Sequence, residues 1–170
     1  MMMEFFVLGM PQILRTAGAN FALFDMEHTD IGFEPVKGQI AGCRGIGLTR
    51  LVPVPALQYH FIARCLDVGA MGIMVPMVES AARAREFVAA IRYPSAGRRG
   101  AAFTVAHDDY ESGSRIEKMA AANERTLVIA LVETAAGVEA IDGVDVVWMG
   151  PFRLDQFHGS AGPVRQSGLP

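Results

Sequence analysis

The chain has 170 residues, a formal net charge of −3 and a pI near 5.8, so it has no basic excess for binding nucleic acid. No apolar run approaches the roughly 20 residues needed to span a bilayer, and the start lacks the basic and apolar regions of a signal peptide. Hydrophobic residues make up 51% of the chain, and the mean hydropathy of +0.28 indicates a buried sheet or contacts between subunits. We expect a cytoplasmic protein with one domain over residues 1–170, whose isolated Cys43 and Cys65 pack in the core.

Short apolar runs alternate with segments of helical spacing along the chain. The runs are almost continuously apolar, which is typical of parallel strands covered on both faces. Between them, the spacing predicts a helix within 55–70 that closes at Gly69, and another that begins after a Ser80 cap and ends before Pro94. Shorter helices are predicted over 114–124 and 134–143. The predicted strands are 5–8, 21–25, 47–52, 72–75, 101–105, 127–132 and 144–149.

This alternation predicts a repeated βαβ architecture. About seven βα units fit a (β/α)8 TIM-type barrel that is incomplete at its C-terminus, and a doubly wound open sheet is the alternative. No strand is followed by GxGxxG or GxxxxGK[ST], which weakens the nucleotide-binding version. In a barrel, chemistry occurs on the loops after the strands. The segment 25–28, Glu133 and the "MGPF" turn at 149–152 all fall there.

Three titratable groups follow the second predicted strand in "FDMEHTD". His28 stands where a general base belongs, although a loop histidine bonded to the backbone is an equally good interpretation. Asp25 or Glu27 is alternatively a cap for a helix that begins after Gly32. The clustering of three such groups after a buried strand favours a functional site.

Two further carboxylates are candidate site residues because of their positions in the sequence. Glu133 ends the apolar run "LVIALVET", where a divalent cation would offset its desolvation, but it also suits the start of a helix. Asp67 lies near a helix C-terminus, where the helix dipole disfavours an anion. An imidazole N–H would hold it there, and an ordinary solvated carboxylate is the alternative.

The segment "RYPSAGRRG" (92–100) places three arginines around a Pro/Gly loop. Such a loop either binds an anionic substrate or a neighbouring subunit's carboxylates, or merely turns the chain.

Taken together, these motifs resemble the HpcH/HpaI aldolase family, which are class II pyruvate-type aldolases. The resemblance rests on "FALFDMEHTD", "ALVET", "VDVVWMGPF" and, most specifically, the long segment that begins "CLDVGAMGIMVPMVES" and ends at Gly100. It runs from about residue 5 to 152. It implies a (β/α)8 barrel, usually hexameric, that cleaves a 4-hydroxy-2-oxo acid into pyruvate and an aldehyde. It also implies a divalent metal such as Mg²⁺, Mn²⁺ or Co²⁺ that acts as a Lewis acid on the pyruvyl oxygens.

The resemblance also suggests roles for individual residues. His28 matches the base that moves the proton of the 4-hydroxyl group, and Asp67 matches the carboxylate that raises its basicity. Glu133 matches one of two metal-binding carboxylates. Gly150 and Pro151 match a turn that contacts the substrate.

The chain departs from the family pattern at three positions. Pro53, in "TRLVPVP", takes the place of an arginine that contacts substrate, and Arg50 is the candidate substitute. Three residues of strand span about 10 Å and reverse the side chain's face, so Arg50 substitutes only after a register shift. Arg153 takes the place of the second metal carboxylate, for which Asp155 is the nearest replacement. Leu131 takes the place of a glutamine.

Residues 153–170 form an atypical tail without strand or helix periodicity, where relatives continue for roughly eighty residues. Codon degeneracy allows "GPVRQ" to become a family-like Gly-Gln-Phe-Asp on a one-base shift, so we expect a frameshifted or otherwise altered ending after about residue 152, which the coding DNA tests. An incomplete barrel exposes sheet edges, so self-association is expected.

The sequence is therefore consistent with three functions. The first is a metal-dependent aldolase with a small keto acid as substrate. The second is an impaired homologue that keeps the fold without efficient metal binding, and the third is a citrate-lyase-type enzyme that acts on acyl-CoA.

Overall fold

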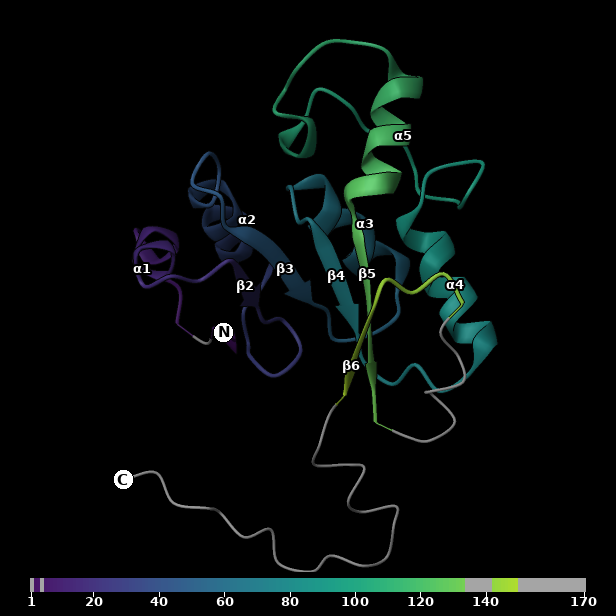
Figure 1. Ribbon diagram of the computed structural model, residues 1–170, viewed down its shortest axis with the longest axis horizontal. Coiled ribbons are helices and arrows are strands. Elements are labelled where there is room, and N and C mark those ends of the chain that lie inside the picture. The colour runs from purple at the N-terminus through teal and green to yellow at the C-terminus, as the bar shows by residue number, and fades with distance from the viewer. Residues whose placement is uncertain (1, 4, 134–141, 150–170) are drawn as a thin grey trace, which may run out of the picture.

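The computed structural model describes residues 2–3, 5–133 and 142–149, which contain a parallel sheet with helices packed against one face and a last helix that extends beyond the end of the sheet (Figure 1). The sheet has six strands in the order β1-β2-β3-β4-β5-β6, so each strand pairs with its neighbours in sequence. In a doubly wound sheet, the spatial order of the strands would depart from their order in the sequence. In a barrel, the two orders are the same. The predicted barrel-type fold, incomplete in the described residues, is confirmed.

The strands are short and the helices span two to three turns. The strands are β1 (Met2–Met3), β2 (Phe21–Phe24), β3 (Thr49–Pro53), β4 (Gly72–Val75), β5 (Leu127–Val132) and β6 (Val146–Met149). The helices are α1 (Met10–Thr16), α2 (Phe33–Gly42), α3 (Tyr59–Asp67), α4 (Ala81–Ile91) and α5 (Arg115–Arg125), with a 3₁₀ turn, η1, at Ala106–Asp108.

Two of the seven predicted strands are wrong, and one strand and one helix were not predicted. Residues 5–8 form a connection that leads into the unpredicted helix α1, and the first strand pairing occurs earlier, at β1. Residues 101–105 do not pair because Thr104 has φ +60°, which breaks an extended run. The backbone N–H groups of Thr104 and Val105 donate to the Asp108 carboxylate instead of to a strand.

The predicted helices 55–70, 80–94 and 114–124 are confirmed with slightly narrower bounds, as α3, α4 and α5. Ser80 caps α4 as predicted, because its hydroxyl accepts the Arg83 backbone N–H at 3.3 Å. The helix predicted over 134–143 lies largely outside the described residues. In the described part of the chain, no helix combines the length and hydrophobicity required to cross a membrane.

Side chains alternate between the two faces of the sheet, and this alternation decides which residues can meet. Phe24, Val52, Ile73 and Val128 pack with the helices in the main core, where Cys43 and Cys65 are also buried, as predicted. The opposite face carries a small inner cluster, which would fill a barrel's interior: Leu23, Leu51, Met74 and Ile129.

Candidate active site at the carboxyl ends of the strands

The loop after β2 is organised by Asp25, whose side chain is buried at 1% exposure. One carboxylate oxygen accepts the backbone N–H groups of Glu27 at 2.8 Å and His28 at 3.3 Å. The Thr29 hydroxyl donates to the Asp25 carbonyl at 2.7 Å and closes the turn. The alternative in which Asp25 or Glu27 caps the next helix is wrong, since α2 begins after Gly32 without a side-chain cap. Asp25 therefore holds the loop that presents Glu27 and His28.

A backbone contact attaches this loop to the next strand. The Met26 N–H donates to the Pro53 carbonyl at 3.0 Å, and the buried Met26 sulfur lies 3.6 Å from the Cys65 Sγ. Pro53, at the end of β3, is buried as well. The backbone carbonyl of Pro53 thus supports the His28 loop, and its side chain is an apolar ring at the position where the family resemblance implies an arginine.

The side chain of His28 on this loop is 68% exposed. Its Nε2 lies 3.6 Å from a carboxylate oxygen of Glu27, which is mostly buried. Glu27 is thus the carboxylate that this chain itself places beside the imidazole. An exposed imidazole next to a buried carboxylate can take up a proton from a bound molecule.

Glu133 directly follows β5, and strand alternation places it on the inner face with Ile129 and Leu131. It lies near enough to Glu27 to affect its titration. Burial raises the pKa of Glu27, the charge of His28 lowers it, and the negative charges of Asp25 and Glu133 raise it further. His28, Glu27 and Glu133 are therefore brought together at the carboxyl ends of the strands.

Replacing Glu27 with glutamine should change how stability depends on pH. Because the folded-state pKa of Glu27 is raised, its contribution is fully present below its ordinary value and is lost as the pH rises through the folded-state value. E27Q does not titrate, so its free energy of unfolding relative to the parent should increase as the pH rises above about 4. Urea unfolding at several pH values measures this difference, and a pH-independent difference would contradict it.

Two other predicted site residues lie at the opposite, amino-terminal ends of the strands. Asp67 is the last residue of α3, and its carboxylate accepts a hydrogen bond from the Arg99 guanidinium at 2.9 Å. Within one chain, a guanidinium and not the expected imidazole holds Asp67. Arg50 is the second residue of β3 and donates from Nε to the Gly69 carbonyl at 2.6 Å.

The strand register explains why Arg50 does not reach the His28 loop. Arg50 pairs with Ala22 and Leu51 pairs with Leu23, without the register shift that a replacement for the family arginine would need. Arg50 shares its side with Val52, which packs against the helices, whereas Leu51 faces inward. Within one chain, therefore, Arg50 and Asp67 lie at one end of the strands, and His28 and Glu133 lie at the other.

The three arginines of the 92–100 loop pair with carboxylates of the same chain. Arg92 contacts Asp145 at 2.8 Å, Arg98 contacts Glu86 at 3.7 Å, and Arg99 contacts Asp67 at 2.9 Å. Asp145 is 53 residues from Arg92 in sequence, which is why local spacing did not reveal the pair. In the described structure, these ion pairs connect the loop to α3, to α4 and to the segment before β6.

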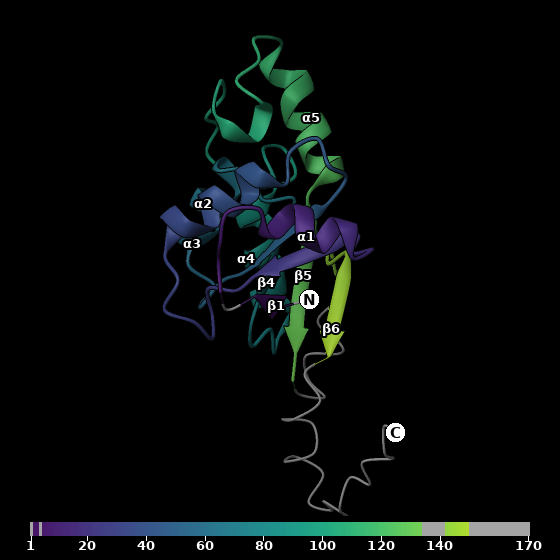
Figure 2. The same ribbon diagram turned by 90° about the vertical axis from the view of Figure 1, so that its left-hand side faces the viewer.

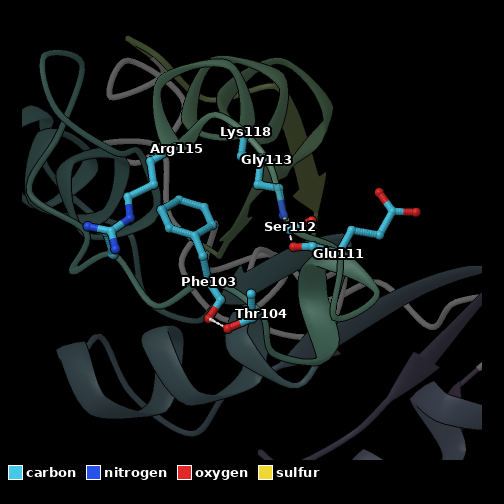
Figure 3. A pocket seen from close by; sticks show the side chains of 8 residues that line it. Phe103, Thr104, Glu111, Ser112, Gly113, Arg115 and Lys118 are labelled. Carbon is cyan, nitrogen blue, oxygen red and sulfur yellow. Dashed lines mark hydrogen bonds between the residues drawn. The ribbon is translucent and has the colours of Figure 1, made fainter.

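The connection before α5 encloses a cavity of about 370 Å³ between Phe103, Thr104, the 111–113 turn and the first turn of α5 (Figure 3). Lys118 lines it, but its ammonium group already donates to the Asp108 carboxylate at 2.7 Å and to the Glu111 carbonyl. All of its lining residues come from this connection and from α5. The cavity is therefore not part of the His28 site.

A divalent metal ion is consistent with the chemistry of the His28 site. Within the described ranges, no group of three or more His, Cys, Asp or Glu side chains is placed to hold a metal. Burial is the largest cause of the raised pKa of Glu27; the negative charges of Asp25 and Glu133 add to it, and a cation would offset that part. Carboxylate oxygens are also the ligands that Mg²⁺ and Mn²⁺ prefer.

The remaining predicted site residues, Gly150, Pro151 and Asp155, lie outside the described residues, as do Arg153 and the tail 153–170. Their predicted roles stay predictions.

Comparisons with known proteins agree with this fold. The chain is 34% identical over 162 residues to a hydroxypyruvate/pyruvate aldolase of Roseovarius nubinhibens, covering 92% of this chain and 63% of that protein. It is 35% identical over 161 residues to a 4-hydroxy-2-oxovalerate aldolase of Novosphingobium aromaticivorans, covering 89% and 59%. The chain therefore spans about three fifths of the length of these relatives.

A similar structure is the HpcH/HpaI aldolase of Desulfitobacterium hafniense, with a TM-score of 0.86 and 29% identity over 93% of this chain and 63% of that one. The citrate synthase SbnG matches with a TM-score of 0.74 and 29% identity, covering 88% and 59%. Residues 9–155 match the family described as HpcH/HpaI aldolase/citrate lyase. The chain belongs to the HpcH/HpaI aldolase/citrate lyase family.

Proposed function

We propose that this protein is a class II pyruvate-type aldolase that cleaves a 4-hydroxy-2-oxo acid into pyruvate and an aldehyde. The observation that carries the proposal is the accessible His28 imidazole, 3.6 Å from Glu27 and at the same strand ends as Glu133. Membership of the family supports the reaction class, as do the names of the two aldolases described above.

His28 would act as the general base in this reaction. It takes the proton from the 4-hydroxyl group as the bond between C3 and C4 breaks, which releases the aldehyde and leaves the electron pair on the three-carbon fragment. Returning the proton to C3 of that fragment then yields pyruvate. Glu27 would orient the imidazole and stabilise its protonated form, since opposite charges at this distance favour the charged state.

A divalent ion, Mg²⁺, Mn²⁺ or Co²⁺, would be held by Glu133 and, outside the described residues, by Asp155. When bound, it supplies Lewis-acid polarisation of the keto-acid oxygens. Asp25 would support the site indirectly by holding the His28 loop in place.

The predicted role of Asp67 toward His28 would require a second copy of the chain. Within one chain, Asp67 lies at the other end of the strands and binds Arg99. The proposal therefore includes a homo-oligomer. It assigns substrate contacts to Gly150 and Pro151, and it assigns Arg50 a substrate role only if another copy brings it to the site.

Release of pyruvate from a 4-hydroxy-2-oxo acid, coupled to lactate dehydrogenase, tests the proposal. We expect release with Mg²⁺, Mn²⁺ or Co²⁺, and at least about a hundredfold loss after treatment with EDTA, because a Lewis acid contributes several kcal/mol to such reactions. Re-adding the metal should restore the rate. Release that is equally fast in EDTA would contradict the metal-dependent mechanism.

A second candidate is an impaired homologue that keeps the fold without efficient metal binding. Pro53 favours it, because the chain has an apolar side chain at the position where the resemblance implies a cationic one. Calorimetry separates the two candidates, since the impaired homologue should show no binding of Mn²⁺. Turnover of an acyl-CoA thioester instead of a keto acid would favour the citrate-lyase-type reaction.

A further inference from the structure

A small cavity of about 70 Å³ lies at the amino-terminal ends of the strands, opposite the His28 site. It is lined by residues from β3, from the connection between α3 and β4, and from the end of α5, which lies beyond the start of β5 (Figure 2). Three arginines line it, Arg50, Arg99 and Arg125, together with His107 and Asp109. We propose that this cavity binds a small oxyanion, namely inorganic phosphate or the phosphoryl group of a small metabolite.

The size of the cavity suits such a ligand. A water molecule needs roughly 10–15 Å³ of cavity volume, so the cavity has room for about five or six waters. A phosphate ion, with one phosphorus and four oxygen atoms, needs similar space. A keto acid with its aldehyde partner is larger, so we distinguish this cavity from the proposed aldolase site.

The charges around the cavity are unbalanced. Arg99 is neutralised by Asp67 at 2.9 Å, and Arg44, just outside the lining, is neutralised by Asp109 at 3.1 Å. Arg50 and Arg125 have no carboxylate within ion-pair distance in the described part of the chain. Two guanidinium charges are therefore left at the cavity.

The simplest competing explanation is that these two arginines only satisfy carbonyl groups at helix ends. Arg50 donates to the Gly69 carbonyl after α3, and Arg125 donates to the His107 carbonyl at 3.0 Å. The carboxyl ends of α3 and α5 each contribute about half a negative charge, or about one charge in total. This offsets only one of the two guanidinium groups, so a net attraction for an anion remains.

Two lining residues also have buried polar atoms without hydrogen-bond partners among the described residues. These atoms are Nε of Arg99, a residue only 3% exposed, and Nδ1 of His107. Such atoms are rare in folded proteins and often mark a missing ion or water. His107 Nε2 lies 2.6 Å from the Ala102 carbonyl and donates to it, because a carbonyl oxygen only accepts.

The titration of Arg50 supports the same conclusion. Burial lowers its pKa, Cys43 and Asp109 raise it, and the positive charges of Arg44 and Arg125 lower it further. An oxyanion in the cavity would counter both the desolvation and the repulsion between these arginines.

Isothermal titration calorimetry of the full chain with inorganic phosphate, at constant ionic strength in chloride, tests the proposal. We expect one phosphate per chain. R125Q should weaken binding about tenfold, because it removes one charge-assisted hydrogen bond from an exposed side chain. R125K keeps the charge and should retain most of the affinity.

Arg115 provides the matched control, since it begins the same helix but lines the separate cavity shown in Figure 3. R115Q should leave phosphate binding unchanged. If R115Q weakens binding as much as R125Q does, or if the parent binds no phosphate, the proposed site is wrong. Because no substrate is present, this result is independent of the aldolase assay.

Glycerol 3-phosphate distinguishes the two sources of the oxyanion. Binding tighter than that of inorganic phosphate, and weakened by R125Q, would identify a phosphorylated metabolite as the ligand. Binding of inorganic phosphate alone would identify the free ion.

Discussion

Replacing His28 with alanine should lower the rate of pyruvate release by about 10²–10⁴-fold, the usual contribution of a positioned general base. The imidazole is 68% exposed and lies 3.6 Å from the mostly buried Glu27, and the loop backbone is held by Asp25 rather than by the His28 side chain. The substitution should therefore remove the proton acceptor without unfolding the loop. The coupled lactate dehydrogenase assay measures the effect at saturating metal.

His60 is a suitable control because it is also exposed but lies on α3, where its ring packs against Phe61. H60A should keep the parent rate within roughly twofold, since a surface change away from the site has little effect. Equal losses in H28A and H60A, or a near-normal rate in H28A, would exclude His28 as the base.

Replacing Arg92 with methionine should lower the free energy of unfolding by about 2–4 kcal/mol, because it leaves several partly buried polar groups unpaired. The guanidinium, in a side chain only 12% exposed, donates to the Asn123 carbonyl, to the Thr126 carbonyl at 2.6 Å and to Asp145 at 2.8 Å. These contacts join the end of α4 to α5 and to the segment before β6. Methionine keeps most of the apolar stem, so the loss reports on the guanidinium.

Arg98, six residues further along the same loop, allows a direct comparison. Its side chain is 61% exposed and lies 3.7 Å from Glu86, a geometry that contributes little in water. R98M should change stability by less than about 0.5 kcal/mol. Similar urea midpoints for R92M and R98M would show that the Arg92 contacts do not hold these elements together.

The sequence predicted much of the fold because its strongest signals are local. Continuous apolar runs marked β2 to β6, and Ser80 and Pro94 marked the limits of α4. The run 101–105 was misleading for an equally local reason. Its residues are strand-like, but Thr104 and Val105 bond to the nearby Asp108 instead of to a strand.

The candidate site was only partly predictable. The sequence alone determined that His28 and Glu133 follow two apolar strands, and parallel pairing then places both at one end of the sheet. Only the tertiary structure decided that Glu27 is the carboxylate beside His28, and that Asp67 pairs with Arg99, 32 residues away in sequence. The physical reason is that strand order follows from patterns repeated along the chain, whereas the partner of a charged side chain depends on distances set by the packing of remote segments. For the same reason, the arginine-lined cavity between β3, the connection from α3 to β4, and α5 could not be predicted from any one motif.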